Sequence, residues 1–291
     1  MPTRRKTKQR GRGSPHGGVY LDIAWIKEKL PNAAEHIKKK LPSMYHQFMQ
    51  LANLDITTTP MEVGPTTHYI MGGIRVDADT QESTVPGLFA AGECAAGING
   101  ANRLGGNSLS DLIVFGKRAG EYAAQYALQN LSGQINADEV EEKTKAALEP
   151  FEREGGENPY TIQHDLQELM QANVGIVRNH DEMLEALNGL DLLRNRAARA
   201  FVPGNIDFNP GWHTALDLHN LLTISEAITR ASIERKESRG GQYREDFPDK
   251  DPEYAKFNFS LKKTEDGAME ISRVQLPDMP DYLKEVIEEM G

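Results

Sequence analysis

The chain has 291 residues, of which 38% are hydrophobic and 26% charged, and its formal net charge is −10 at pH 7. This length allows one large domain or two ordinary ones with a substantial core, and the composition is that of a soluble globular protein. The negative charge argues against nucleic acid as the main ligand. The single cysteine, Cys94, excludes an internal disulfide and a multi-cysteine metal or iron–sulfur site, and we expect no metal centre.

The first ten residues form a basic segment without an apolar core, with Arg4, Arg5, Lys6, Lys8 and Arg10. Such a run is more often a solvated, disordered tail than a contact for nucleic acid or anionic lipid. It is not a secretory signal, because no apolar segment follows it. The longest weakly polar stretch, residues 85–98, is too short to cross a bilayer. We therefore expect any membrane association to come through a partner.

Short helices are predicted at the start of the globular part, within residues 11–60. Pro31 and Pro42 interrupt a stretch of helical character, because proline removes a backbone donor and clashes with the preceding turn. The stretch is thereby divided into helices predicted at residues 26–30, 33–41 and 43–51.

Strands and tight turns are predicted next, over residues 61–134. The run PTTHYIMGGIRVD, residues 65–77, predicts a strand, a glycine turn and a second strand. The run VPGLFAAGE, residues 85–93, predicts a proline–glycine turn that leads into a buried strand. A glycine-rich loop at residues 97–106 then precedes a long helix predicted over residues 108–128.

One side of this long helix carries small and apolar residues that indicate close packing. Glycine is costly inside a helix, so we expect a neighbouring backbone to approach the two glycines of the stripe. The stripe comprises Leu109, Leu112, Ile113, Gly116, Ala119, Gly120 and Ala123.

The remaining chain is predicted to form a helical domain over residues 135–255 and a C-terminal extension over residues 256–291 with short strands at 256–261 and 268–274. Two apolar stripes at helical spacing belong to the core of a small antiparallel bundle. They are Leu166, Leu169, Met170, Val174 and Val177, and Leu218, Leu221, Leu222, Ser225 and Ile228. The predicted fold class is α+β.

The loop before the long helix is a candidate anion site. Its glycines allow close approach of a ligand to the backbone, and Asn107 or Ser108 is expected to cap the helix, which directs free amide groups into the loop. Arg103 lies in this loop, and its planar guanidinium can bind a carboxylate through two donors.

Two further residues are candidates on weaker grounds. His68 precedes the Gly72–Gly73 turn in an apolar stretch, where a lone histidine is more often a core residue than a catalytic one. Glu93 follows a predicted buried strand, the position at which an acidic residue binds a nucleotide ribose in doubly wound folds. Spacing alone favours a loop or cap carboxylate for Glu93.

Together these segments resemble, in order and spacing, the flavoprotein subunit of succinate dehydrogenase and fumarate reductase. The runs that carry the resemblance are PTTHYIMGGIRVD, VPGLFAAGECA and NGANRLGGNSLSDLIVFGKRAG, and the NRLGGNSL stretch is highly specific. The similarity extends to GRGSPHGGVYLD at residues 11–22 and to ESRGGQYREDFPDKD at residues 237–251. The chain thus resembles a C-terminal half: a remnant of the capping domain at 11–60, the C-terminal part of a FAD-binding α/β domain at 61–134, and a helical domain.

The resemblance implies catalytic roles for two residues. His68 would hydrogen-bond one carboxylate of succinate or fumarate. Arg103 would hold a carboxylate and fix the dicarboxylate against the flavin. Asn99 occupies a position where many family members carry histidine.

The resemblance also implies FAD as the cofactor. Glu93 would bind the adenosine ribose, and Asn107, Ser108 and Leu109 would contact the isoalloxazine ring, the last two through backbone amides. A helix N-terminus stabilises negative charge, which suits the electron-rich side of a reduced flavin.

The implied activity is that of an oxidoreductase of electron transport and the tricarboxylic acid cycle. It interconverts succinate and fumarate by hydride transfer with FAD and passes electrons to an iron–sulfur subunit. The implied location is cytoplasmic, peripheral to the inner face of the plasma membrane through partner subunits.

Part of the family's flavin site has no counterpart in the sequence. The dinucleotide-binding pattern GxGxxG is absent; Gly11-Arg12-Gly13 comes nearest, but His16 stands in the third glycine's place. We therefore expect a separate N-terminal flavin-binding half, with residues 1–10 foreign to the family. The isolated chain is expected to retain little FAD and to be inactive.

Two alternatives remain open. L-Aspartate oxidases share the histidine, the arginine and an ESRG-type run, so the chain is alternatively a fragment of such an enzyme. The second alternative is a non-catalytic remnant that only packs against a partner subunit. The length and helical content after Leu131 favour the succinate and fumarate enzymes.

Overall fold

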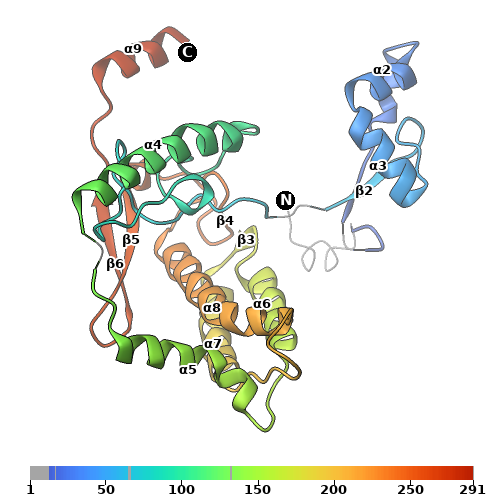
Figure 1. Cartoon of the computed structure of the whole chain (residues 1–291). Helices are drawn as coiled ribbons and strands as arrows, with labels where there is room; N and C mark the ends of the chain where they lie inside the picture. Colours follow the sequence, from blue (N-terminus) through green and yellow to red (C-terminus); the bar gives the residue numbers. More distant parts are fainter. Residues whose placement is uncertain (1–12, 17, 65–66, 132, 291) are drawn as a thin grey trace. The chain divides into compact units, whose positions relative to one another are not determined.

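The computed structural model describes residues 13–16, 18–64, 67–131 and 133–290. The basic segment at residues 1–10 lies outside this part of the chain. The chain divides into two compact units, Met1–Thr67 and His68–Gly291, and each is described by itself (Figure 1). Both units contain helices and short strands, which confirms the α+β class.

The first unit pairs a two-stranded antiparallel sheet with short helices. Ile37, Ile56 and Met61 form its buried core. Pro42 starts the second α-helix at its first turn, where a missing backbone donor costs nothing, so the predicted break is confirmed. The elements are β1 (Val19–Leu21), η1 (Ala24–Glu28), α2 (Ala33–Lys40), α3 (Pro42–Ala52) and β2 (Met61–Val63).

The second unit begins with a segment of loops that leads into η2 (Gly92–Cys94) and the long helix α4 (Asn107–Gln129). The predicted strands at 65–77 and 85–93 are wrong for the described residues, which form isolated bridges instead of ladders. Ile74 pairs in parallel with Ala95, Val76 pairs with Ser83, and Glu82 pairs with Phe89, each as a single bridge. Short bridges of this kind still hold the loops against one another.

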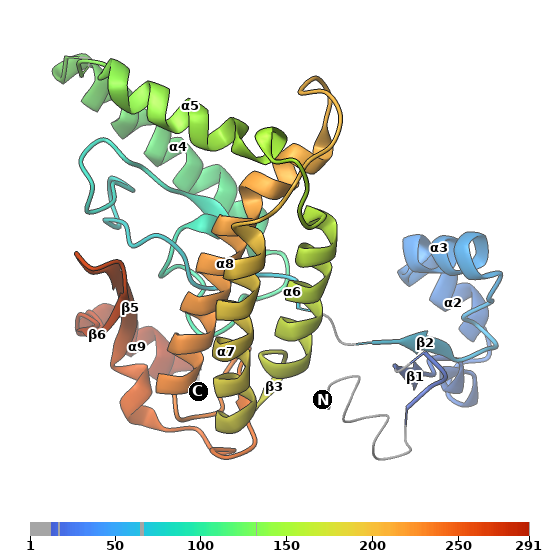
Figure 2. The ribbon, with the colours of Figure 1, turned by 90° about the horizontal axis from the view of Figure 1, so that it is seen from below.

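Four helices follow: α5 (Ala137–Glu152), α6 (Pro159–Asn173), α7 (His180–Ala197) and α8 (Pro210–Glu234). Each begins after an asparagine whose side chain accepts backbone N–H groups of the first turn. Helices α6, α7 and α8 lie side by side (Figure 2). The three-helix bundle confirms the prediction from hydrophobic spacing, but the first predicted stripe runs past its helix: Val177 lies in a short strand beyond the end of α6. Leu221 of the second stripe is exposed.

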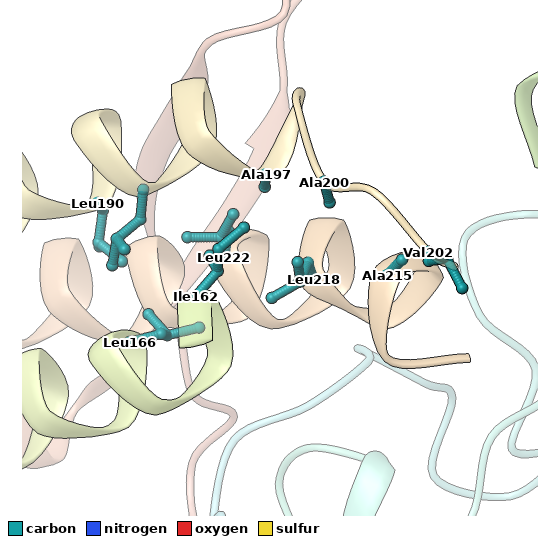
Figure 3. Packing of buried hydrophobic residues seen from close by; sticks show 10 residues of the cluster. Ile162, Leu166, Leu190, Ala197, Ala200, Val202, Ala215, Leu218 and Leu222 are labelled. Carbon is teal, nitrogen blue, oxygen red and sulfur yellow. The ribbon is translucent and has the colours of Figure 1, made fainter. Parts of the chain in front are cut away.

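Buried aliphatic side chains of these three helices and of the connection between α7 and α8 form the main core (Figure 3). Leu190 and Leu218 are fully buried, and Leu166 and Leu222 from the predicted stripes lie beside them. The cluster comprises Ile162, Leu166, Leu190, Leu193, Ala197, Ala200, Val202, Ala215, Leu218 and Leu222.

The C-terminal part returns to short strands. Strand β3 (Val177–Arg178) pairs in parallel with β4 (Tyr243–Arg244), and η3 (Pro252–Ala255) precedes a hairpin. The hairpin strands β5 (Phe257–Lys263) and β6 (Met269–Gln275) are antiparallel and confirm the two predicted strands. Helix α9 (Asp281–Met290) follows. Across the described residues, no helix combines the length and apolar content needed to span a membrane.

The predicted packing stripe of α4 is wrong within the described chain. Leu109 and Ile113 are 67% and 74% exposed, and Asp111 is the buried residue of the helix. No atom of another described segment lies within 4 Å of a side chain added at Gly116 or Gly120. The described residues therefore do not supply the close backbone contact that these glycines led us to expect.

Candidate functional site

The loop at residues 97–106 carries Arg103 to the N-terminus of α4. The helix starts at Asn107, with Gly106 as its N-cap at φ 89° and without a side-chain capping bond. The expectation that Asn107 or Ser108 caps this helix is therefore wrong. Glycine adopts the left-handed cap conformation without the steric cost that a side chain would bring, so Asn107 becomes the first helical residue. The first-turn amides of α4 consequently have no side-chain cap.

Arg103 is partly buried and keeps most of its donors free. Its Nη1 donates to the carbonyl oxygen of Leu104 at 3.2 Å, and its buried Nε has no hydrogen-bond partner among the described residues. Its guanidinium carbon lies 4.6 Å from the ring centroid of Tyr69. No carboxylate of the described chain forms an ion pair with Arg103. The charge is thus held in place without being neutralised.

Tyr69 is the residue around which the candidate site gathers. Its hydroxyl donates to Oδ2 of Asp111 at 3.4 Å. Burial, and then the negative charges of Asp111 and Glu93, raise the pKa of Tyr69, while a hydrogen bond with the Asn99 side chain acts in the opposite direction. The phenol is therefore neutral at physiological pH and acts as a donor.

Asp111 is a buried carboxylate, 4% exposed, on the side of α4 that faces Tyr69. Its second oxygen, Oδ1, has no hydrogen-bond partner among the described residues. A buried carboxylate is costly unless it accepts hydrogen bonds. Burying Asp111 beside the candidate site with one oxygen unpartnered therefore lowers the stability of the fold.

The segment that carries His68 lies beside Glu93. His68 is exposed, and the backbone amide of Ile70 donates to Oε1 of Glu93 at 3.1 Å. The Ile74 amide donates to the carbonyl oxygen of Cys94 at 2.7 Å, which extends the contact along the two segments. Glu93 therefore anchors the His68 segment through one oxygen.

Glycine at position 92 lets this arrangement pack onto α4. Gly92 has φ 73°, and a β-carbon there would lie 2.4 Å from Cδ2 of Leu112. A side chain would both strain the backbone and push the turn of η2 away from the helix. Leu112 and Gly92 thus set the distance between Glu93 and the helix that carries Asp111.

The segment after α8 supports the Arg103 loop from another side. The amide of Gly241 donates to the carbonyl oxygen of Ala101 at 2.9 Å. Glu237, fully buried, pairs with Arg235 and Arg239 in the same segment. The ESRGG run is therefore a rigid support for the loop.

The structure brings the segments of His68, Glu93 and Arg103 together around Tyr69. Ser108 and Leu109 lie in the first turn of α4, just beyond the loop. Sequence reasoning missed Tyr69 and Asp111. The only charged residue in the run NSLSDLIVFG, residues 107–116, was the signal that could have identified Asp111.

Two family descriptions match the chain. "FAD binding domain" matches residues 3–109, and "Fumarate reductase flavoprotein C-term" matches residues 163–286. The first match includes most of the basic segment, which we had placed outside the resemblance. The chain belongs to the succinate dehydrogenase/fumarate reductase flavoprotein family. It resembles the C-terminal half of that flavoprotein subunit. The predicted family and its cofactor, FAD, are thereby confirmed.

Relatives of this flavoprotein family align over most of the chain. One subunit of the fumarate reductase (CoM/CoB) of Methanothermobacter marburgensis is 38% identical over 255 residues, covering 88% of this chain and 45% of that protein. The fumarate reductase flavoprotein subunit of Mycobacterium tuberculosis is 34% identical over 270 residues, with coverages of 89% and 45%. The chain therefore spans about half the length of the curated relatives that it matches.

Solved structures of the same flavoprotein family share the fold. Mycobacterium smegmatis Sdh1 in complex with UQ1 matches with a TM-score of 0.84 and 47% identity, covering 97% of this chain and 47% of that chain. A quinol–fumarate reductase with menaquinol molecules matches with a TM-score of 0.80 and 30% identity, over 94% and 48%.

Proposed function

We propose that the chain is the dicarboxylate-binding and flavin-contacting part of a flavoprotein that interconverts succinate and fumarate. The observation that carries the proposal is Arg103, held on the ring of Tyr69 with a buried, unpartnered Nε and no ion pair within the described chain. A guanidinium in this state is prepared to bind a carboxylate.

Arg103 and His68 each bind a carboxylate group of the dicarboxylate. Arg103 binds one carboxylate, and His68, exposed on the neighbouring segment, hydrogen-bonds a carboxylate as well. Two attachment points fix the central carbon–carbon bond of a four-carbon dicarboxylate, and this positioning is the main contribution that a protein makes to hydride transfer.

The loop and the start of α4 fit a flavin. A side chain added at Gly105 or Gly106 would meet no described atom within 4 Å, so a flat ring has room to approach the backbone. The start of α4 directs the backbone amides of Ser108 and Leu109 toward the flavin ring, and Asn107 lies beside them. Glu93 is assigned to the adenosine ribose of FAD. FAD, when bound, accepts or gives the hydride; the chain's own groups bind and orient.

The partners follow from the same proposal. The unmatched half of the relatives' length supplies the remainder of the flavin site, and an iron–sulfur subunit takes the electrons. Attachment to the inner face of the plasma membrane comes through further subunits. The chain carries no role in nucleic-acid binding.

The test is a visible spectrum of the purified protein, with every chain that co-purifies, before and after succinate. A bound flavin band that bleaches on succinate and returns with fumarate supports the proposal. Replacing Arg103 with glutamine should lower kcat/KM at least about 100-fold while flavin content stays unchanged, because the lost donors act on the substrate. The matched control, Arg118→Gln on α4, should have wild-type kinetics.

Bleaching by L-aspartate instead of succinate would contradict the proposed substrate. Wild-type turnover in the Arg103 variant would contradict the assignment of the site.

A further inference from the structure

We infer that Tyr69 and Asp111 are positioning residues that present the guanidinium of Arg103 to the ligand. This inference deepens the proposed function and rests on it for the identity of the ligand. The three residues come from separate parts of the chain: Tyr69 from the segment after the first unit, Arg103 from the glycine-rich loop, and Asp111 from α4.

The contact between Arg103 and the ring of Tyr69 does not use the hydrogen-bond donors of the guanidinium. Arg103 lies over the face of Tyr69, with its guanidinium carbon 4.6 Å from the ring centroid. Contact through the face leaves the N–H groups in the guanidinium plane, where they can donate to a carboxylate. A salt bridge to a protein carboxylate would instead occupy those donors.

Two carboxylates lie near Arg103 without forming a salt bridge to it. Glu93 and Asp111 both raise the pKa of Tyr69 through their charge, so both lie near its ring. Yet neither forms an ion pair with Arg103 within the described chain. Glu93 accepts from the amide of Ile70, and Asp111 accepts from the hydroxyl of Tyr69. One oxygen of each carboxylate thus accepts from another donor, and the charge of Arg103 is not neutralised by either carboxylate.

Asp111 acts through Tyr69. Its Oδ2 accepts the phenol proton at 3.4 Å and so restrains the ring on which Arg103 rests. Asp111 is 4% exposed and lies in α4, a regular helix, which makes it a fixed reference point. The order of action is Asp111 to Tyr69 to Arg103, and only Arg103 is expected to touch the ligand.

The experiment measures Arg103 itself as well as ligand binding. Phenylglyoxal modifies accessible guanidinium groups, and the rate at each arginine is followed by peptide mass spectrometry in the purified protein with its co-purifying chains. Arg118 is the internal reference, since it lies on α4 and binds the carbonyl oxygen of Ala78 away from the site. Titration calorimetry with succinate gives the dissociation constant.

The expected results form a series. Tyr69→Leu removes the ring and should raise the Arg103 modification rate at least about fivefold and weaken succinate binding about tenfold, the size of a partly buried cation–π contact. Tyr69→Phe and Asp111→Leu should each give a smaller change of about threefold. Asp111→Asn, which keeps an acceptor, should lie near the wild type. Tyr122→Leu, a control on the same helix, should change neither quantity.

The possible results distinguish the positioning role of Tyr69 and Asp111 from the proposed function. If Tyr69→Leu leaves both the Arg103 rate and succinate binding at wild-type values, the positioning role is wrong. A parallel rise at Arg118 would also overturn it, since that pattern reports general unfolding. If the Arg103 rates follow the series but the wild-type protein binds no succinate, the positioning role stands and the proposed function fails.

Discussion

The backbone amide of Gly241 donates a hydrogen bond to the carbonyl oxygen of Ala101 at 2.9 Å, two residues before Arg103. This bond joins the segment after α8 to the glycine-rich loop, across some 140 residues of sequence. The position of the candidate arginine therefore depends on the C-terminal part of the chain as well as on the loop's own residues.

Substitution of Gly240 should move that loop. A β-carbon at this position would lie 2.1 Å from the Ala101 oxygen, and the backbone has φ 65°. We expect Gly240→Ala to destabilise the protein by about 1–3 kcal/mol through strain and displacement. Succinate affinity should fall as well. Chemical denaturation and calorimetry measure the two effects. Gly155→Ala is the control, because nothing lies within 4 Å of its added carbon; equal effects of the two substitutions would contradict the prediction.

Loss of the Glu237 charge should weaken the segment after α8 that holds the glycine-rich loop. This fully buried carboxylate pairs with Arg235 and Arg239. Glu237→Gln leaves two partly buried cations without a counter-charge, so we expect a loss of about 3 kcal/mol in the free energy of unfolding. Urea denaturation provides the value. The exposed Glu121, which pairs with Lys117 on α4, is the control, and Glu121→Gln should cost at most about 0.5 kcal/mol.

The same carboxylate should make stability depend on acid pH. Burial by itself would raise the pKa of Glu237, but hydrogen bonds from Arg239, the Asp251 amide and Arg235 outweigh it, and the net shift is downward from 4.5. The folded state therefore holds its proton less tightly than the unfolded state. The stabilisation is present above pH 4.5 and is lost as the pH falls below it. Unfolding curves between pH 7 and pH 3 should show a shallower acid loss in Glu237→Gln than in the wild type.

A second carboxylate, in the first unit, should titrate far from its usual range. The Ser14 side chain and His16 lower the pKa of Glu62 to about 2. The His16 amide donates to Oε1 of Glu62 at 3.0 Å, and the His16 ring Nδ1 lies 2.7 Å from Oε2. The side chain should therefore remain ionised until the pH approaches that value. The carboxyl carbon shift in an NMR titration measures it. His16→Ala should move the midpoint upward, and an unchanged midpoint in this variant would show that the histidine contact is absent in solution.

The bundle core offers a stability test that is independent of the site. Leu218 is fully buried among α6, α7 and α8, whereas Leu192 on α7 is 66% exposed. Leu218→Ala should lower the free energy of unfolding by about 3–4 kcal/mol through lost burial and a residual cavity. Leu192→Ala should stay within about 0.5 kcal/mol. Similar values for both, measured by denaturant unfolding, would mean that the bundle core is packed differently.

Much of the helical part could be predicted because its signals are local. Apolar residues such as Leu166 and Leu222 recur at helical spacing, and asparagines such as Asn158 and Asn209 stand where side chains cap the following helix. These features depend on residues a few positions apart. The predicted strands at 65–77 and 85–93 failed because a strand needs a partner. In these segments Ile74, Val76 and Phe89 each have one bridge partner, and none of the bridges extends into a ladder.

The sequence by itself determined the helical region and the C-terminal hairpin, since residue type and spacing suffice for these. It also indicated His68, Glu93 and Arg103 as candidates, because the runs that carry them resemble a known family. Tertiary structure alone decided that Arg103 rests on Tyr69, that Asp111 restrains that ring, and that Gly106 rather than Asn107 caps α4. The first two are contacts across 34 and 42 residues of chain, and the third is a choice of backbone conformation. Each is settled by the packing of distant segments, which no local pattern encodes.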